Sequence, residues 1–223
     1  MRITVFGATG GIGAQAVRQA VEAGHRVTAV VRDPARLTGP APARVVTAAV
    51  TDAAQEVLAD AVAGADAVLS GLGPRSRADL GITQTATKAI VRAMKASDTR
   101  RIIVVSAAPV STTPSPGVPR PPRHDPGEGF VMRNVLTPMI KLVFDWNYTD
   151  LAIMEDVLRD SGLDWTSVRP PRLTDKPRTG RYRTAIEQNL RGGMRIARAD
   201  VADLMLNAIE RGETIGHAVG IAY

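Results

Sequence analysis

The chain contains no cysteine, and its 223 residues include only three histidines. The absence of cysteine excludes a disulfide framework, a thiolate nucleophile and a zinc site with cysteine ligands. His25, His124 and His217 are far apart in the sequence, so we expect no histidine-rich metal site and predict no bound metal. Aromatic residues make up only 4% of the chain, and the core must therefore consist mainly of Ala, Val, Ile and Leu.

Lysine is also scarce, because 24 of the 28 basic residues are arginine and only four are lysine. The net charge is +6, but the arginines are dispersed and few aromatic residues are available to stack on bases. We therefore expect no nucleic-acid partner, and we interpret the basic excess between Arg169 and Arg198 as solvated surface or, less favourably, as a face for an anionic substrate. No apolar run suits a signal peptide or a membrane helix, which predicts a cytoplasmic protein without a membrane partner.

Short β-branched runs alternate with Ala-rich stretches of helical spacing. The expected strands are 3–6, 27–31, 44–48, 67–69, 102–105 and 165–168, and the expected helices are 14–23, 53–63 and 83–96. Such alternation indicates βαβ units, and we predict a single Rossmann-like α/β domain over residues 1–223, with a doubly wound parallel sheet. We expect Gly24 to end the first helix, and Asp52 with Gln55 resembles a capping box that opens the second.

A proline-rich segment interrupts this alternation. Seven prolines lie between residues 108 and 129, a density that cannot sustain a helix or a strand. Long loops in compact domains are often lids, binding loops or disordered segments, and of these we predict a lid insertion over residues 107–147. Within it, residues 130–144 are apolar and predict a short helix that packs the loop down, with Met132, Leu136, Met139, Ile140 and Val143 on one face.

The most specific motif is the glycine-rich sequence Gly-Ala-Thr-Gly-Gly-Ile-Gly at residues 7–13. It follows the first expected strand directly and opens the first expected helix, which is the context in which such a motif binds phosphate. Gly7, Gly10 and Gly13 allow a tight turn, close approach of the backbone to a pyrophosphate, and close packing of helix on strand. Backbone N–H groups at the helix N-terminus then contact the anion, which predicts a dinucleotide cofactor.

Arg32 stands at the end of the second expected strand, 19 residues after Gly13, where the ribose selector of such motifs lies. An arginine there can hold a 2′-phosphate through two charge-assisted hydrogen bonds, which favours NADP(H) over NAD(H). Asp33 follows directly, but because Pro34 comes next we interpret it as an N-cap rather than a ribose ligand. Arg36 is either a second phosphate contact or a solvated residue, and we favour the second alternative.

Four further segments, 31–33, 67–73, 104–106 and 161–171, complete a pattern that resembles the atypical short-chain dehydrogenase/reductases. The resemblance is to the NAD(P)H-binding proteins that include biliverdin-IXβ reductase/flavin reductase and NmrA-like proteins. It implies that the adenine and phosphate half of the cofactor site is formed by Gly7, Thr9, Gly10, Gly11, Ile12 and Arg32. It also implies that Leu72 and Gly73 touch the ribose, that Ser106 lies beside the nicotinamide, and that Pro170 and Pro171 shape the far wall.

The sequence departs from this family pattern at three places. Arg172 stands where the flavin reductase has a histidine, and Asp52 either replaces an adenine-binding aspartate or caps its helix. Tyr148 is followed four residues later by Ala152, so the Tyr-x-x-x-Lys pair of the standard enzymes is broken. Without that lysine the pKa of the phenol stays near 10, which makes Tyr148 a poor catalytic acid; the alternative is that Tyr148 starts a helix and packs the lid.

The remaining chemistry depends on the cofactor. Ser106 either orients the nicotinamide or a substrate carbonyl, or only satisfies the end of its strand. A conjugated acceptor needs only a well-placed hydride and a proton from water, so we expect an NADPH-dependent reductase of a flavin, quinone or related small molecule. The alternatives are a non-catalytic NADP-binding redox sensor and a nucleotide-sugar epimerase-like enzyme. We expect a monomer or a homodimer.

Overall fold

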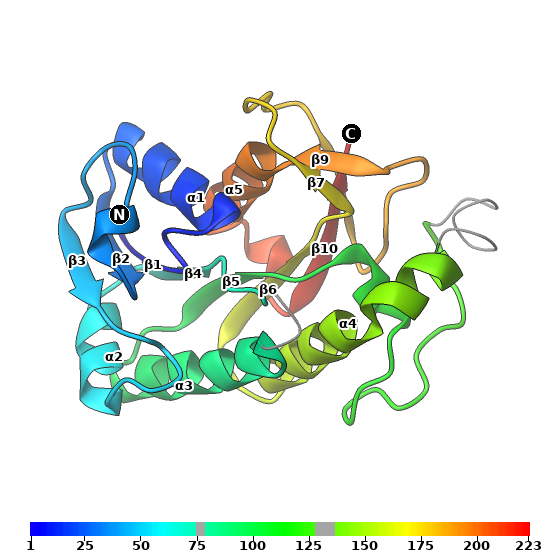
Figure 1. The fold of residues 1–223 in the computed structure, drawn as a ribbon, viewed down its shortest axis with the longest axis horizontal. Coiled ribbons are helices and arrows are strands. Elements are labelled where there is room, and N and C mark those ends of the chain that lie inside the picture. Colours follow the sequence, from blue (N-terminus) through cyan, green and yellow to red (C-terminus); the bar gives the residue numbers. More distant parts are fainter. Residues whose placement is uncertain (75–78, 128–136) are drawn as a thin grey trace.

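The computed structural model describes residues 1–74, 79–127 and 137–223, and these form a mostly parallel sheet covered by helices on both faces (Figure 1). The eight strands of the sheet follow the order β3-β2-β1-β4-β5-β6-β10-β8, and only β8 runs antiparallel to its neighbour. They are β1 (Arg2–Phe6), β2 (Arg26–Val31), β3 (Arg44–Thr47), β4 (Ala67–Ser70), β5 (Arg101–Val105), β6 (Asp164–Arg169), β8 (Arg183–Ile186) and β10 (His217–Ala222). A second, two-stranded sheet pairs β7 (Arg172–Thr174) with β9 (Arg195–Ala197).

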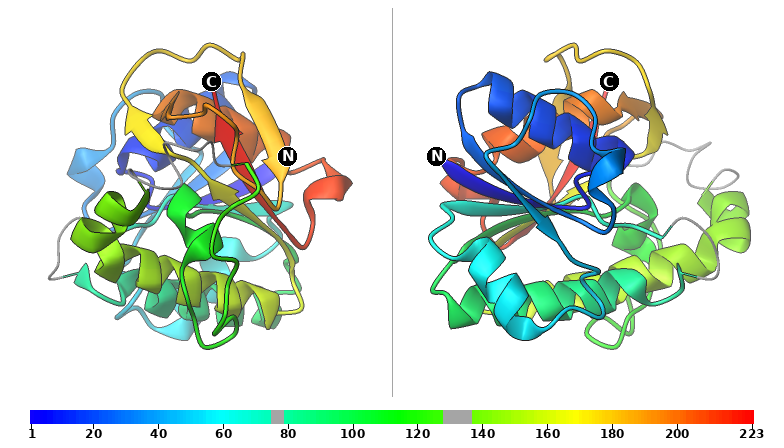
Figure 2. Two further views of the ribbon diagram at one scale, coloured as in Figure 1. Left: turned by 90° about the vertical axis from the view of Figure 1, so that its right-hand side faces the viewer. Right: turned by 60° about the vertical axis from the view of Figure 1, so that its left-hand side comes forward.

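Helices α1 (Gly11–Glu22) and α5 (Arg198–Asn207) lie side by side on one face of the large sheet. Helices α2 (Gln55–Val62), α3 (Ile82–Ala96) and α4 (Thr137–Arg159) cover the other face (Figure 2). Successive strand residues point to opposite faces, so Val5 is buried under α1 and α5 whereas Phe6 is buried over α2, α3 and α4. The sheet is thus apolar on both sides, as a covered parallel sheet requires, and the predicted doubly wound α/β class is confirmed.

Two of the three local signals that we took from the sequence are confirmed. Gly24 adopts φ +80° and its N–H donates to the carbonyl of Val21, which ends α1 at the expected place. The carboxylate of Asp33 accepts a hydrogen bond of 3.0 Å from the N–H of Ala35 and so caps the short 3₁₀ helix η1 (Pro34–Arg36).

The third signal, the capping box, was wrong. Helix α2 begins at Gln55 with Ala54 in the N-cap position and no side-chain cap. The side chain of Gln55 instead donates to the carbonyl of Ala89 in α3, 3.3 Å away, because packing between the two helices offers it a partner there. Asp52 is therefore not needed to start α2, and its side chain accepts a hydrogen bond from Thr51.

Helix α4 also differs from the expectation. We expected a short helix over 130–144 and a second helix starting near Tyr148, but one helix of 23 residues runs from Thr137 to Arg159. Tyr148 consequently lies near the middle of a helix rather than at its start. Residues 130–136 and the side chains of the predicted apolar face at 132–143 lie outside the described part of the chain.

The described part of the proline-rich segment is attached firmly to the rest of the molecule. It contains one short 3₁₀ helix, η3 (Ala108–Thr112), which the prolines did not lead us to expect. The carboxylate of Asp156 in α4 accepts hydrogen bonds from Ser115 (3.0 Å) and from the N–H of Gly117 (2.9 Å). Asp125 accepts from the N–H of Asn189, 2.8 Å away. That the 107–147 segment closes over the site as a lid stays a prediction.

The elements after β6 were not predicted individually, although they contribute two strands to the large sheet and one helix. Strands β7 (RLT), β8 (RTAI) and β9 (RIA) lack the run of consecutive β-branched or apolar residues that marks the earlier strands. The short 3₁₀ helix η5 (Gly212–Thr214) then leads to β10. None of the helices in the described ranges is long and apolar enough to cross a membrane.

Candidate functional site

A cleft of about 780 Å³ lies along the carboxyl ends of the parallel strands. The residues that directly follow successive strands line it: Gly7, Arg32, Ala48, Gly71, Ser106 and Pro170. The chain proceeds outward from β1 through β2 to β3 and then returns to place β4 on the other side of β1. Ligands of open α/β sheets bind at such a switch point, so the topology alone selects this cleft.

The glycine loop forms one end of the cleft. Gly7 adopts φ +71° and its carbonyl accepts a 2.8 Å hydrogen bond from the N–H of Gly10, which closes a tight turn. A Cβ on Gly13 would lie 2.1 Å from the carbonyl oxygen of Gly7, so only glycine lets α1 approach the strand end this closely. Gly13 itself is not among the residues lining the cleft, whereas Thr9, Gly10, Gly11 and Ile12 are.

Helix α1 begins at Gly11 and carries no acidic residue in its first turn. The N–H groups at this end are therefore not neutralised by a neighbouring carboxylate and are suited to bind an anion.

Arg32 lines the cleft at the end of β2 and is exposed. The neighbouring Asp33 uses its carboxylate to cap η1, so the one nearby acid in the sequence is engaged elsewhere. Asp52 also lines the cleft, while Arg36 does not. The structure thus brings Arg32 and Asp52 to one site and leaves Arg36 outside it, in agreement with our interpretation of Arg36.

Leu72 and Gly73 follow β4, and Pro170 and Pro171 follow β6; all four line the middle and far wall of the same cleft. Arg172, which stands where the resembled flavin reductase has a histidine, starts β7 and is not among the lining residues.

Ser106 follows β5 and is 5% exposed. Its N–H donates to the carbonyl of Val168 at 2.8 Å, so the backbone satisfies the strand end without help from the side chain. The hydroxyl lies near the carboxylate of Glu155 but makes no hydrogen bond of normal geometry with any described residue. A buried hydroxyl that lies between a carboxylate and a cleft can donate to Glu155 or turn to a ligand in the cleft.

Tyr148 reaches the cleft from α4 and is half-buried. Burial raises the pKa of its phenol above the ordinary value, and no lysine stands at position 152 to lower it. The preceding residue, Asn147, was missed by the sequence analysis; its carboxamide oxygen is buried without a hydrogen-bond partner among the described residues, and Asn147 also lines the cleft. The only feature of the sequence that could have indicated Asn147 as a site residue is its position next to Tyr148.

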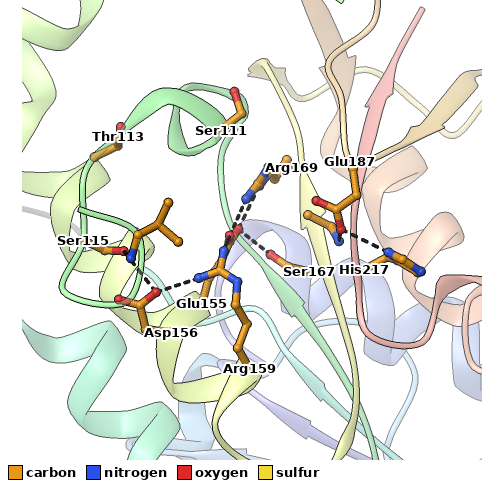
Figure 3. A network of polar contacts seen from close by, with 12 residues as sticks. Ser111, Thr113, Ser115, Glu155, Asp156, Arg159, Ser167, Arg169, Glu187 and His217 are labelled. Atoms are coloured by element: carbon orange, nitrogen blue, oxygen red, sulfur yellow. Dashed lines mark hydrogen bonds and ion pairs between the residues drawn. The ribbon is translucent and has the colours of Figure 1, made fainter. Parts of the chain in front are cut away.

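A buried ion pair joins β6 to α4 (Figure 3). Its carboxylate lies close to Ser106. Arg169 of β6 donates through Nε to Glu155 of α4 at 2.9 Å, and Ser167 donates to the same carboxylate at 2.8 Å. Burial by itself would raise the pKa of Glu155, but the charge and hydrogen bonds of Arg169 and the hydrogen bond of Ser167 hold it below its usual value. The interpretation of Arg169 as solvated surface was therefore wrong, since β6 is covered by helices on both faces.

Arg198 is the second basic residue, after Arg169, that does not belong to a merely solvated surface as we had interpreted it. It is the first residue of α5 and lines the cleft at the glycine loop. Its Nη1 lies 2.6 Å from a carboxylate oxygen of Asp175, which belongs to the loop after β7. Arg198 belongs to the basic excess that we assigned to the surface, and its place at the loop depends on α5, which was not predicted.

The fold has counterparts among solved structures. A candidate NADH-flavin reductase from Streptococcus pneumoniae is 24% identical, with a TM-score of 0.75 over 100% of this chain and 99% of that chain. A short-chain dehydrogenase/reductase from Veillonella parvula in complex with NADP is 19% identical, with a TM-score of 0.72 over 100% of this chain and 94% of that one. A candidate exported protein from Burkholderia pseudomallei is 27% identical, with a TM-score of 0.72 over the full length of both chains.

Residues 7–211 match the model of a family described as NAD(P)H-binding. The matched range begins in the glycine loop and ends after α5. The resemblance drawn from the sequence is thereby confirmed, and the chain belongs to the NAD(P)H-binding family.

Proposed function

We propose that this protein is an NADPH-dependent reductase that transfers a hydride to a flavin, a quinone or a related small conjugated acceptor. The observation that carries the proposal is the composition of the cleft. One end combines the glycine loop with Arg32, and the other end offers the buried hydroxyl of Ser106 but, among the described lining residues, no histidine or lysine.

For the cofactor, we propose that backbone groups from Gly7 to Ile12 hold the phosphates and that Arg32 holds the 2′-phosphate. Asp52 would accept hydrogen bonds at the adenosine end. Leu72 and Gly73 would contact the ribose, and Ser106 and Pro170 the nicotinamide. Gly13 would act indirectly, by allowing α1 to pack against the loop.

For the acceptor, the proposal rests on which side chains the cleft contains. None of the described residues that line it is a histidine or a lysine, and burial raises the pKa of Tyr148. A neutral phenol of raised pKa donates a hydrogen bond but is a weak acid at pH 7. When bound, NADPH supplies the hydride, and a conjugated acceptor can take its proton from water. Ser106 and Asn147 then offer polar atoms that orient the reacting rings.

The same lack of an acid also favours one other function, a redox sensor that binds NADP(H) without turnover. A nucleotide-sugar epimerase is less well supported, because it needs a tyrosine that exchanges a proton readily. A cytoplasmic location and a monomeric or homodimeric state stay predictions.

Steady-state oxidation of NADPH with FMN, riboflavin and menadione as acceptors tests the proposal. We expect turnover with at least one of them and a lower kcat/KM with NADH as donor. Tight binding of NADPH with no turnover over this panel would favour the sensor instead.

A further inference from the structure

The side chain of Arg198 lies directly against the glycine loop. A Cβ built on Gly11 would come within 2.6 Å of Cδ and 2.9 Å of Nε of Arg198, and no other atom lies so close to that position. The space that any other residue at position 11 would fill is therefore occupied by the arginine. This brings a guanidinium from the start of α5 to the N-terminal end of α1.

Buried contacts fix the start of α5 relative to α1. Gln19 of α1, itself buried, donates a 2.8 Å hydrogen bond to the carbonyl of Ala199, the residue after Arg198. Asp200, also buried, accepts hydrogen bonds of 2.8 Å from the N–H groups of Thr179 and Gly180. Because both neighbours are held in place, the approach of Arg198 to the loop is built into the fold.

The guanidinium keeps most of its donors available. Among the described residues its hydrogen bonds involve only Asp175, through Nη1, and that carboxylate is 87% exposed. Exposed ion pairs of this kind are weak and exchange readily with water. The Nε and Nη2 groups can therefore donate to a ligand that lies on the loop.

Two of the described residues that line the cleft are arginines, and they lie at different places. Arg32 lies at the end of β2, where the ribose selector belongs, and Arg198 lies at the loop that would cradle the pyrophosphate. We propose that Arg198 is a second cationic ligand of the cofactor, one that binds the pyrophosphate. The inference rests on the proposed function only in that the cleft must bind a dinucleotide. Arg32 then recognises the phosphate that only NADP(H) carries, whereas Arg198 binds the group that NADP(H) and NAD(H) share.

Ligand fragments separate these two contacts. Titration calorimetry would measure the affinities of the wild-type protein, Arg198→Ala and Arg32→Ala for NADPH, NADH, ADP-ribose and adenosine 2′-monophosphate. We expect Arg198→Ala to weaken the three ligands that contain a pyrophosphate by about tenfold or more, and to change adenosine 2′-monophosphate by less than about twofold. Arg32→Ala should show the complementary pattern, with losses for NADPH and adenosine 2′-monophosphate only.

Asp175→Asn is the matched control, because it breaks the same ion pair and leaves the arginine in place. If Arg198 only anchored the loop after β7, Asp175→Asn would weaken ADP-ribose as much as Arg198→Ala does, and that result would overturn the proposal. Unchanged ADP-ribose affinity in Arg198→Ala, with a melting temperature that shows an intact fold, would overturn it as well. Binding is measured without turnover, so a missing reductase activity would count against the proposed function and not against Arg198. If the wild-type protein bound no ADP-ribose, the proposed function and the proposed role of Arg198 would both be wrong.

Discussion

Arg169 donates hydrogen bonds to both carboxylate oxygens of Glu155, although Arg169 is only 7% exposed and Glu155 is fully buried. The pair joins β6 to α4, and Arg159 adds a second, partly exposed contact to the same carboxylate (Figure 3). Ser106 lies close to this carboxylate as well. Removing one member of a buried pair leaves a charge without compensation, which costs far more than the pair itself contributes. The ion pair therefore fixes the geometry of α4 next to Ser106, where we propose that the nicotinamide binds.

We expect Glu155→Ala to lower the free energy of unfolding by about 3 to 5 kcal/mol, because Arg169 would remain buried and uncompensated. Urea unfolding followed by circular dichroism measures the change. Arg100→Ala is the control: its ion pair with Asp164 is largely exposed, and its loss should cost less than about 1 kcal/mol. If the two variants lost equal free energy of unfolding, burial would not be the reason for the cost of removing Glu155.

The stability of the protein should also depend on pH through Glu155. Its folded pKa is lowered, so its stabilising contribution is complete above the unfolded value of about 4.3 and is lost as the pH falls through the folded pKa. The free energy of unfolding of the wild type should then decline in the acid range below about pH 5. Glu155→Gln removes this titration, and its profile from pH 7 to pH 3 should be flatter. Parallel profiles for the two proteins would show that other carboxylates are responsible.

The sequence was informative wherever the signal was local. The glycine loop, Arg32 and the N-cap of Asp33 depend on neighbours within a few residues, and alternation alone predicts the strands up to β6. The ion pair of Glu155 with Arg169 and the approach of Arg198 to Gly11 depend on which elements pack together. That packing includes the C-terminal strands; β7, β8 and β9 lack a run of consecutive β-branched or apolar residues, and Gly220 interrupts the run in β10.

Two glycines of the loop should respond differently to the same substitution. Gly13→Ala places a methyl group against the backbone carbonyl of Gly7, so we expect a loss of about 1 to 3 kcal/mol in stability together with a loss of NADPH binding. Gly11→Ala meets only the flexible side chain of Arg198, which can move aside. Its melting temperature should stay close to that of the wild type while its affinity for NADPH falls.

Specificity between the two dinucleotides should depend on Arg32. Arg32→Ala should lower kcat/KM for NADPH by about tenfold or more and leave the value for NADH within about threefold, because only NADPH carries the 2′-phosphate. Arg36→Ala serves as the matched control, since this arginine is close in sequence but does not line the cleft. Equal losses with the two donors in Arg32→Ala would disprove the assignment of the 2′-phosphate.

The roles of Ser106 and Tyr148 can be separated by their kinetic effects. Ser106→Ala removes the buried hydroxyl at the edge of the cleft and should lower kcat with a quinone or flavin acceptor by about tenfold. Tyr148→Phe should change kcat by less than about threefold, because a phenol whose pKa is raised by burial is a poor proton donor near neutral pH. For the same reason, the wild-type pH–rate profile should show no limb assignable to Tyr148 between pH 6 and pH 9. The opposite result would be a loss of about a hundredfold in kcat for Tyr148→Phe, together with a wild-type pH–rate limb between pH 6 and pH 9 that this variant lacks. Tyr148 would then be the acid, and water would be excluded as the proton source.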